Sequence, residues 1–574
     1  MKTILAAINA KYIHSNLAVY SLRAYAEEYL SQTEIAEYTI NQEIGEILMD
    51  LYERKPDILC FSCYIWNLDY VERIVREIHK VLPDTILWLG GPEVSYDAEE
   101  VLIRLPEVSG VMKGEGEETF RELLDCYYKG TADVEEINGV TVRTKNGDIR
   151  ENPWREIMDL SKVPFVYGDM SLFAHKIIYY ETSRGCPFRC SYCLSSIDKC
   201  LRFRDLDLVK KELQFFLDQK VEQVKFVDRT FNCRHDHAVA IWRYILEHDN
   251  QITNFHFEIS ADLLNDEEIE LIGKMRPGLI QLEIGVQSTN PNTIREIKRT
   301  MDFGKLKEKV MKIEAGGNVH QHLDLIAGLP CEDYESFGKS FNDVYSLFPE
   351  QLQLGFLKVL KGSYMYEHRL EYGLLYQSRP PYEVLATKWL PYGDVIRLKK
   401  IEEMVEVYYN SGQFAHTIRS LAREWETPFA FFEDLAGFYD AEGLFGRNYT
   451  RIARYELLLE FMQKQRIQKE TYFRELLIYD LYLRENVKSR PGFAGEETVS
   501  KEEKKDFYDR EEKEPKYLTA YRGYDSRKMR KLTHVERFSF HVAEDGKAGE
   551  TVLLFDYQNR NPLNYEASVY EIIL

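Results

Sequence analysis

No apolar run in this sequence approaches the roughly 20 residues that a helix needs to cross a bilayer, so we expect no membrane span. The first residues, MKTILAAINAKYIH, hold too short an apolar stretch for a secretory signal, and we predict a strand there. Cysteine is scarce, since nine in 574 residues are too few for a disulfide scaffold. Three of them are tightly clustered, which predicts metal-bound thiolates and a reducing cytoplasm.

Positive charge is in deficit as well. Lys and Arg total 74 against 95 Asp and Glu, a formal net charge of −21. A protein that binds duplex nucleic acid needs a basic footprint, so we expect no such partner. The hydrophobic fraction of 44% and the charged fraction of 29% are typical of a globular protein and argue against wholesale disorder. At roughly 150 residues per domain, the length indicates about three or four domains.

Residues 1–130 alternate short apolar strands with amphipathic helices, starting with a strand at Lys2–Asn9 and a helix at Ser15–Leu30. This alternation predicts a doubly wound, Rossmann-like α/β domain, whose ligands lie beyond the carboxyl ends of the strands. Two glycine-containing segments, Gly90-Gly91 and Gly114-Glu115-Gly116, follow predicted strands at that edge.

Residues 131–175 read as a connecting segment with a small hairpin that turns at Asn146-Gly147. A second alternating series over residues 176–362 predicts a partial (β/α)6 barrel with functional groups at the carboxyl ends of its strands. Its strand candidates are Ile177–Glu181, Gln223–Val227, Asn254–Ile259, Leu279–Val286, His320–Ala327 and Gln353–Leu360.

Residues 363–574 form a mainly helical, aromatic-rich region that ends in a small β tail. We expect helices over Ile452–Gln463 and Thr471–Leu483, and a solvated charged linker over Lys501–Lys516. The tail is predicted to be a pair of strands, Arg537–Val542 and Thr551–Tyr557.

A Cys-x3-Cys-x2-Cys loop, formed by Cys186, Cys190 and Cys193, follows the first strand of the second series. Thiolates hold iron–sulfur clusters, and the usual cube takes four of them. Three in one loop would leave the fourth iron open to a ligand, and Arg184 and Arg189 suit an anionic or zwitterionic one. Structural zinc usually requires four ligands in paired spacings, and no partner pair is evident. We therefore predict a [4Fe-4S] cluster here.

At these residues the sequence resembles the radical S-adenosylmethionine (SAM) superfamily, over roughly residues 175–360. The resemblance implies that the open iron chelates SAM, and that one electron from a donor such as flavodoxin or ferredoxin cleaves it to methionine and a 5′-deoxyadenosyl radical. A carboxylate can accept both ribose hydroxyls, and an arginine can hold a carboxylate through two hydrogen bonds. The residues implied to contact SAM are Tyr192, Asp228, Glu258, Gln287, Ser288, Arg299 and Asp324.

The glycine segments of the amino-terminal domain resemble those of a cobalamin-binding domain. Glycine there lets the backbone approach a flat macrocycle. No Asp-x-His-x-x-Gly motif occurs, and we expect His14 to have a surface role, so the corrin would be bound without a histidine ligand. The alternative is a degenerate domain that keeps the fold without the cofactor. The residues implied to contact cobalamin are Ser62, Gly90, Gly91, Ser95, Gly114, Glu115 and Gly116.

Three other cysteines can be interpreted from their positions. Cys60 and Cys63 lie three apart in one apolar strand, which sends them to opposite faces, so we expect two buried thiols. Cys331 follows Gly328-Leu329-Pro330 and is a candidate catalytic residue that donates a hydrogen atom to a substrate radical. The carboxy-terminal region is similar to a domain of uncharacterised function attached to this subclass, and suits a cap that protects a radical from solvent, or a partner surface.

Our leading hypothesis is a cobalamin-dependent radical SAM enzyme, in its sharper version a methyltransferase that acts on an unreactive carbon of an unknown substrate. One alternative is a rearrangement or cyclisation enzyme without methyl transfer. An RNA methylthiotransferase would need further amino-terminal cysteines for a second cluster and a basic tail. A sensor that binds a cluster and a corrin without turnover would not need Glu258, Gln287, Arg299 and Asp324 together.

Overall fold

The computed structural model describes residues 1–130, 132–197, 200–544 and 546–574. Residue 131, where the predicted connecting segment begins, lies outside the described residues. The chain divides into two compact units. The first contains Met1–Val319, Ile326–Asp333 and Gly355–Tyr392, and the second contains His320–Leu325, Tyr334–Leu354 and Gly393–Leu574.

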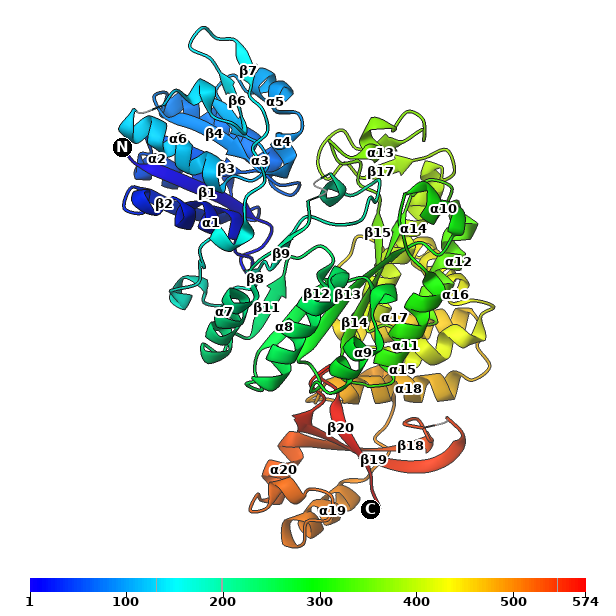
Figure 1. The fold of residues 1–574 in the computed structure, drawn as a ribbon. Coiled ribbons are helices and arrows are strands. Elements are labelled where there is room, and N and C mark those ends of the chain that lie inside the picture. The colour runs from blue at the N-terminus through cyan, green and yellow to red at the C-terminus, as the bar shows by residue number, and fades with distance from the viewer. Residues whose placement is uncertain (131, 198–199, 545) are drawn as a thin grey trace. The chain divides into compact units, whose positions relative to one another are not determined.

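The first unit begins with a seven-stranded sheet in the order β2-β1-β3-β4-β5-β6-β7 (Figure 1). Strands β1 to β5 are parallel, whereas the predicted hairpin, β6 and β7, extends the sheet in antiparallel fashion. The strands are β1 (Thr3–Asn9), β2 (Thr33–Thr39), β3 (Ile58–Ser62), β4 (Ile86–Gly90), β5 (Gly110–Met112), β6 (Val140–Arg143) and β7 (Ile149–Glu151). The helices are α1 (Leu17–Tyr25), α2 (Ile44–Arg54), α3 (Leu68–Val81), α4 (Pro92–Ser95), α5 (Ala98–Arg104) and α6 (Glu117–Lys129).

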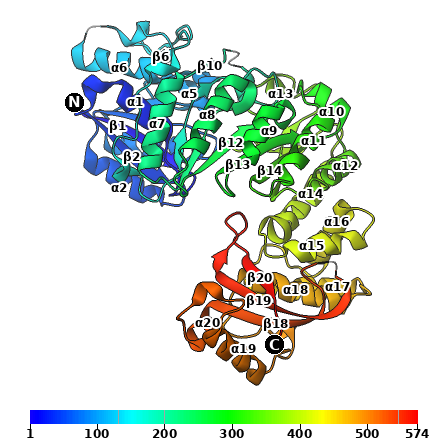
Figure 2. The same ribbon diagram turned by 60° about the horizontal axis from the view of Figure 1, so that its bottom comes forward.

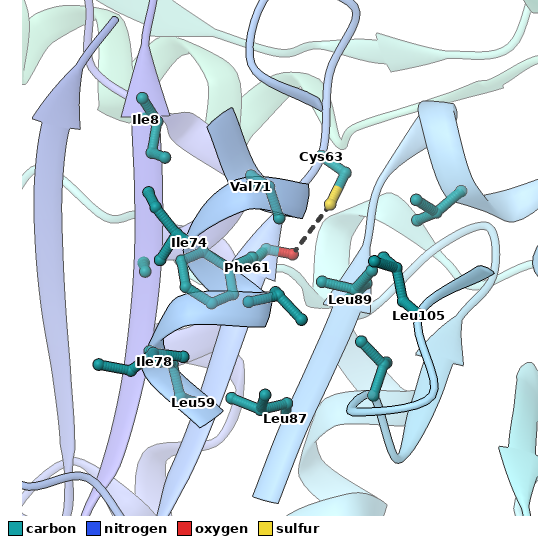
Figure 3. Close-up of a cluster of buried hydrophobic side chains, with 14 of the residues drawn as sticks. Ile8, Leu59, Phe61, Cys63, Val71, Ile74, Ile78, Leu87, Leu89 and Leu105 are labelled. Carbon is teal, nitrogen blue, oxygen red and sulfur yellow. Dashed lines mark hydrogen bonds between the residues drawn. The ribbon is translucent and has the colours of Figure 1, made fainter. Parts of the chain in front are cut away.

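Both faces of this sheet are buried. Every residue of β1 is buried, as expected for a parallel strand covered by helices on both sides. On one face Phe61 packs with residues of α3 such as Val71 and Ile74 (Figure 3). Cys63 belongs to that core and donates from Sγ to the Phe61 carbonyl over 3.7 Å, whereas Cys60 belongs to the core of the other face. The prediction of two buried thiols on opposite faces is confirmed.

The second alternating series forms a six-stranded sheet in the order β15-β14-β13-β12-β11-β8. The described pairings of β8, β11, β12 and β13 are parallel, as in the predicted partial barrel. The strands are β8 (Ile178–Tyr180), β11 (Gln223–Phe226), β12 (Asn254–Ile259), β13 (Ile280–Gln287), β14 (His320–Ala327) and β15 (Gln351–Phe356). The helices are α7 (Leu206–Asp218), α8 (His235–Glu247), α9 (Asp266–Gly273), α10 (Pro291–Glu296), α11 (Phe303–Glu314) and α12 (Tyr334–Tyr345).

Strands β12, β13 and β14 of this sheet alternate between buried and partly exposed residues, and most of the buried residues are apolar. In β13, for example, Leu282 and Ile284 are buried, while Glu283 and Gln287 lie on the partly exposed face. A side-chain period of two places all such polar groups on one face of the sheet. That face therefore holds the polar side chains that could contact a ligand, and the other face packs against the helices.

A short antiparallel pair, β9 (Ser183–Arg184) and β10 (Arg202–Phe203), flanks the cysteine loop. Beyond the barrel, the first unit also contains α13 (Tyr364–Glu367) and the strand pair β16 (Leu375–Tyr376) and β17 (Val384–Ala386). The segment from Gly355 to Tyr392 is thus compact with the first unit.

The second unit is mainly helical up to residue 532 and ends in a three-stranded antiparallel sheet. Figures 1 and 2 show α19 and α20 beside this sheet. The helices are α14 (Tyr392–Val405), α15 (Ala415–Leu421), α16 (Pro428–Ala441), α17 (Arg451–Lys464), α18 (Glu470–Arg484), α19 (Lys501–Lys513) and α20 (Ser526–Leu532). The strands are β18 (Thr533–Phe540), β19 (Ala548–Arg560) and β20 (Ala567–Glu571), in that order.

Two expectations for this region need correction. The charged stretch predicted to be a solvated linker is helix α19, because Ser500 and Glu503 form a capping box and Phe507 and Tyr508 are buried. The tail has a third strand, β20, beside the predicted pair. Among the residues that the structure describes, no helix is both long enough and apolar enough to cross a bilayer.

A buried ion pair fixes the segment before the barrel to its first helix. The Arg204 guanidinium lies 2.5 Å (Nη2–Oε1) and 2.9 Å (Nε–Oε2) from the Glu212 carboxylate, and both side chains are 7% exposed. Arg204 also donates from Nη1 to the carbonyls of Leu160 and Val163, each over 2.8 Å, and Tyr180 donates to Glu212 Oε2. The Glu212 carboxylate therefore neutralises the Arg204 guanidinium, which in turn donates to the two backbone carbonyls.

We expect Glu212→Gln to lower the free energy of unfolding by about 3 kcal/mol or more, because removing one partner leaves a buried charge uncompensated. The shift in the urea midpoint of the far-UV signal measures this. The matched control is Glu267→Gln, which breaks the exposed Arg243–Glu267 pair at 2.8 Å and should leave the midpoint unchanged. Equal midpoints for the two variants would contradict the prediction.

Candidate functional site

The carboxyl ends of β3, β4 and β5 meet at one edge of the first sheet. Ser62 is the register partner of Gly90, and Gly90 that of Met112. Ser95 Oγ donates to the Gly91 carbonyl over 2.8 Å and accepts from the Gly114 amide over 3.3 Å. The two predicted glycine segments are thus joined at the edge where a doubly wound sheet binds its ligand.

Gly91 is required by the chain itself. Its φ is +114°, and a Cβ at this position would lie 2.4 Å from the Cys63 carbonyl oxygen. A side chain is therefore excluded on both conformational and steric grounds. The turn leaves the sheet edge as bare backbone, which suits a flat ligand.

The loop after β1 lies at the same edge. Asn16 Nδ2 donates to Ser62 Oγ over 2.9 Å, which orients the hydroxyl predicted to bind a cofactor tail. His14, expected to have a surface role, is partly exposed and also contacts the barrel. A bridge to Ile177 brings His14 against β8, where its Nδ1 lies 2.6 Å from Tyr179 Oη, and burial lowers the pKa of the imidazole.

Glu115 is engaged in protein contacts. Its Oε1 pairs with Arg184 Nη1 at 2.9 Å and with Arg202, and its Oε2 accepts from the Met158 amide over 3.2 Å. Gly116 precedes α6 and packs against Leu22. The cobalamin contacts of Glu115 and Gly116 remain predictions.

The cysteine loop leaves β9 at the carboxyl end of the barrel's first strand. Cys193 donates its amide to the Cys190 carbonyl over 3.2 Å, which makes a tight turn, and Cys186 Sγ lies 3.9 Å from Thr230 Oγ1. Burial raises the pKa of the Cys186 and Cys190 thiols, and nearby Cys193 raises both further. Ligation to a cationic centre would favour the thiolate forms of Cys186 and Cys190.

The donor set is chemically suited to an iron–sulfur cluster, because cysteine thiolates are the usual ligands of such clusters. Among the described residues, no group of three Cys, His, Asp or Glu side chains that could hold a metal ion is found. We expect Cys186, Cys190 and Cys193 to hold the cluster.

Arg299 lies beside this loop and is positioned to hold an anion. It donates to the Gly285 carbonyl over 2.5 Å and to Tyr192 Oη over 3.3 Å, and its Nη1 lies 3.8 Å from Cys190 Sγ. Its Nε is buried, with no hydrogen-bond partner among the described residues. The described contacts of Arg299 include no carboxylate, so a ligand carboxylate would supply the missing counter-charge.

Gln287, at the end of β13, combines backbone strain with an unsatisfied atom. Its φ is +72°, and its Oε1 is buried without a hydrogen-bond partner among the described residues. Strain of this kind and buried unpaired polar atoms concentrate at functional sites. Gly285 makes room for the side chain, since a Cβ there would lie 2.3 Å from Gln287 Nε2. Gln287 thus fits the predicted SAM contact.

Two other predicted contacts are occupied by the protein. Ser288 is buried and donates to Glu332 Oε1 over 2.6 Å. Asp228 accepts from the Thr182 amide at 3.0 Å and from the Thr182 and Ser183 hydroxyls, each at 2.6 Å. Burial raises the pKa of Asp228 to about 6. Both side chains shape the strand ends here, and their contact with SAM remains a prediction.

The remaining candidates lie on β12, β14 and the cysteine loop. Glu258 faces Glu283 across the β12–β13 register. Asp324 lies on β14 in the second compact unit, where its Oδ1 is 2.9 Å from His322 Nε2. Tyr192 packs against an apolar cluster and is held at its hydroxyl by Arg299.

Sequence reasoning assigned no role to two residues at strand ends. Thr230, two positions after Asp228, contacts a predicted cluster ligand. Glu93, directly after the turn at Gly91, is 5% exposed, and its Oε2 has no hydrogen-bond partner among the described residues. Burial raises the pKa of Glu93, and a hydrogen bond with Tyr382 opposes this. Both are polar residues within four positions of a strand end, which was the available signal in the sequence.

A doubly wound sheet with a glycine-lined edge, followed by a partial barrel that places three thiols, a buried arginine and a strained glutamine together, defines a cofactor-binding α/β barrel protein. Three family models match it: the B12 binding domain at residues 3–124, the radical SAM superfamily at residues 180–344, and a protein of unknown function (DUF4080) at residues 370–555. The chain thus has an amino-terminal B12-binding domain, a radical SAM domain and a carboxy-terminal DUF4080 domain. Its family cofactors are a [4Fe-4S] cluster, SAM and cobalamin.

Curated proteins and solved structures are similar to parts of this chain. The 2-(S-pantetheinyl)-carbapenam-3-carboxylate methyltransferase of Streptantibioticus cattleyicolor is 27% identical over 306 residues, 49% of this chain and 44% of the relative. The cobalamin-dependent radical SAM methyltransferase TokK of Streptomyces tokunonensis is 26% identical over 344 residues, 55% and 49%. The alignments thus span about half the length of these curated relatives. TsrM from Kitasatospora setae, solved with cobalamin and a [4Fe-4S] cluster, shares the fold (TM-score 0.57, 17% identity, 69% of this chain and 90% of TsrM).

We expect Gly285→Ala to raise the dissociation constant for SAM by at least roughly tenfold, because the added methyl displaces Gln287 and crowds Arg299. Anaerobic calorimetry on the cluster-loaded protein measures this. The matched control is Gly273→Ala, at the end of α9, where a Cβ meets nothing within 4 Å. Unchanged SAM affinity in Gly285→Ala would show that the predicted site lies elsewhere.

Proposed function

We propose that this chain is a cobalamin-dependent radical SAM enzyme that transfers a methyl group to an unreactive carbon of its substrate. The observation that carries the proposal is the buried Arg299, without a described carboxylate partner, beside a three-thiol loop and a strained Gln287. This combination suits an amino acid bound to the open iron of a cluster. The B12-binding domain ahead of the barrel, and the two methyltransferases among the relatives, support the methyl-transfer version.

Each group supplies a different part of the chemistry. The cluster held by the three cysteines would supply the electron for SAM cleavage, and cobalamin at the glycine-lined edge would supply the methyl group. Each methylation consumes two SAM and two electrons: one SAM leaves S-adenosylhomocysteine, the other leaves methionine, and the substrate hydrogen ends in 5′-deoxyadenosine.

The side chains of the protein bind and orient. We propose that Cys186, Cys190 and Cys193 hold the cluster, that Arg299 holds the SAM carboxylate, and that Gln287 fixes the ligand through its unsatisfied oxygen. The glycine-lined edge of the first sheet would receive the corrin. An external donor such as flavodoxin or ferredoxin would supply the electrons, in a reducing cytoplasm that preserves the thiolates.

The decisive experiment is anaerobic purification with hydroxocobalamin supplied, followed by metal counts and product analysis. We expect about four irons and about one cobalt per chain. In the presence of the methyl acceptor, S-adenosylhomocysteine and 5′-deoxyadenosine should form in equal amounts. The Cys190→Ser variant should lose iron and SAM cleavage but keep cobalt. Iron without cobalt, or no S-adenosylhomocysteine with any substrate, would refute methyl transfer.

A second candidate, a radical rearrangement or cyclisation enzyme without methyl transfer, is favoured by Cys331. Burial raises the pKa of this thiol, which keeps it protonated, and its φ is +64°. The thiol would give a hydrogen atom to a substrate radical, and the resulting thiyl radical would take an electron from the external donor and a proton from solvent.

If Cys331 is the hydrogen donor, Cys331→Ala should lose product while 5′-deoxyadenosine formation continues. Chromatography of the two products with the same preparation measures this. The matched control is Cys126→Ala, which removes a thiol buried in the first domain. Normal product formation by Cys331→Ala would rule out the hydrogen-donor role.

A further inference from the structure

Five charged side chains connect the glycine segment after β5 to the strand that enters the cysteine loop. Arg184 is their centre. Its Nη1 lies 2.9 Å from Glu115 Oε1, and its Nη2 lies 2.9 Å from Glu117 Oε1 and 2.7 Å from Glu181 Oε2. Its Nε donates to Glu181 Oε1 over 2.9 Å, and Arg202 joins the network at Glu115. We call this set the inter-cofactor ion network.

The network is shielded from solvent. The exposed fractions of the side chains are 6% for Glu117, 13% for Arg202 and between 20% and 21% for the other three. Charge-assisted hydrogen bonds with little solvent access are strong, and the planar guanidinium fixes their direction. The expectation that Arg184 serves an anionic ligand is therefore corrected, because three carboxylates of the protein already surround it.

The backbone is constrained at both ends of the network. Arg184 stands two residues before Cys186, and it pairs with Arg202 across the β9–β10 register. Gly185, which lies between Arg184 and Cys186, has a φ of +91°, and a Cβ there would lie 2.7 Å from the Cys200 carbonyl oxygen. At the other end, Glu115 lies between the two glycines predicted to contact cobalamin. The backbone on both sides is thus held within a residue or two of a predicted cofactor contact.

We propose that Arg184 is a positioning residue that sets the separation between the cluster and the corrin. The inference rests on the proposed two-cofactor function. The methyl group on the corrin and the radical derived from SAM must reach the same substrate carbon, and a misplacement of about 1 Å can cost roughly 10²-fold in rate. A rigid link between the two binding segments meets that tolerance.

A purely stabilising role is the competing explanation, and the chain offers a control for it. Lys176 Nζ pairs with Glu37 Oε2 at 2.6 Å, with exposed fractions of 11% and 13%, and it too joins the first domain to the barrel. Lys176 precedes β8 and contacts Glu37 Oε2, whereas Glu37 Oε1 accepts from the Asn16 amide over 3.2 Å. Lys176→Gln therefore removes an inter-domain ion pair of similar burial, while it leaves the Glu37 contact with the loop after β1 and all partners of Arg184 in place.

The experiment is a pulsed electron paramagnetic resonance measurement on the full chain, loaded with cluster and hydroxocobalamin and reduced with dithionite. The dipolar coupling between the reduced cluster and cob(II)alamin reports their separation. We expect a narrow distribution in the wild type and in Lys176→Gln, and a broad one in Arg184→Gln. Arg184→Gln should also lose methyl product by roughly tenfold or more, while 5′-deoxyadenosine formation changes less than about twofold.

Further variants keep the inference open to test if Arg184→Gln folds poorly. Glu117→Gln removes one of the three carboxylates and should broaden the distribution less, and Arg184→Lys should recover part of the narrow distribution. A distribution that Arg184→Gln leaves unchanged, or that Lys176→Gln broadens equally, overturns the positioning role alone. No cluster–cobalt coupling in the wild type overturns the two-cofactor proposal and this inference with it.

Discussion

The geometry of parallel strands is the constraint on which the rest of the structure depends. Neighbouring parallel strands have their carboxyl ends at the same edge of the sheet, so residues that are distant in sequence lie close together there. Ser62, Gly90 and Gly114 meet in this way at the end of the first sheet. At the second sheet, Gln287 ends β13, and the cysteine loop follows the end of β8. Both faces of the first sheet are buried, which leaves its edge as the place where polar groups can be exposed to a ligand, whereas the second sheet also has partly exposed polar groups on one face.

The edges differ in how their charges are satisfied, and the difference separates framework from site. Arg184 has three carboxylate partners, and Asp228 accepts three hydrogen bonds. Arg299 and Gln287 retain buried atoms without described partners. A folded chain rarely leaves buried polar atoms unpaired unless something else completes them. The unsatisfied groups are therefore better indicators of ligand contact than polar residues that the protein already pairs.

Local pattern predicted the strands of the second sheet. β14 has the predicted bounds, His320–Ala327, and its residues alternate between partly exposed and buried positions throughout. The charge density of residues 501–516 predicted a linker, whereas the structure has helix α19 there, with Phe507 and Tyr508 buried. Charge alone cannot distinguish a linker from a helix whose one apolar stripe is narrow.

Residue pairing across the fold was beyond the reach of the sequence. The sequence predicts a ligand contact for Glu115 and another for Arg184, yet the two side chains pair with each other across 69 positions. Nothing local in the sequence predicts the bridge between His14 and Ile177. Ion pairs and long-range bridges are properties of the tertiary fold, so a motif can name the residue types at a site but not which of them the protein uses for itself.

The segment Gly355–Tyr392 shows that the carboxy-terminal family region is more than an appended domain. Its beginning is part of the first compact unit. The Met365 amide donates to the Ser191 carbonyl over 2.8 Å, inside the cysteine loop, and Lys361 pairs with Asp97, close to the glycine edge of the first sheet. Tyr382 reaches the buried Glu93 beside that edge.

One short segment thus contacts both predicted cofactor-binding regions, in parallel with the ion network around Arg184. The segment is followed directly by α14, so the family region at residues 370–555 begins inside the first unit and continues into the second. The contacts of Lys361, Met365 and Tyr382 thus hold the start of this region's chain against the parts of the first unit that are predicted to bind the two cofactors.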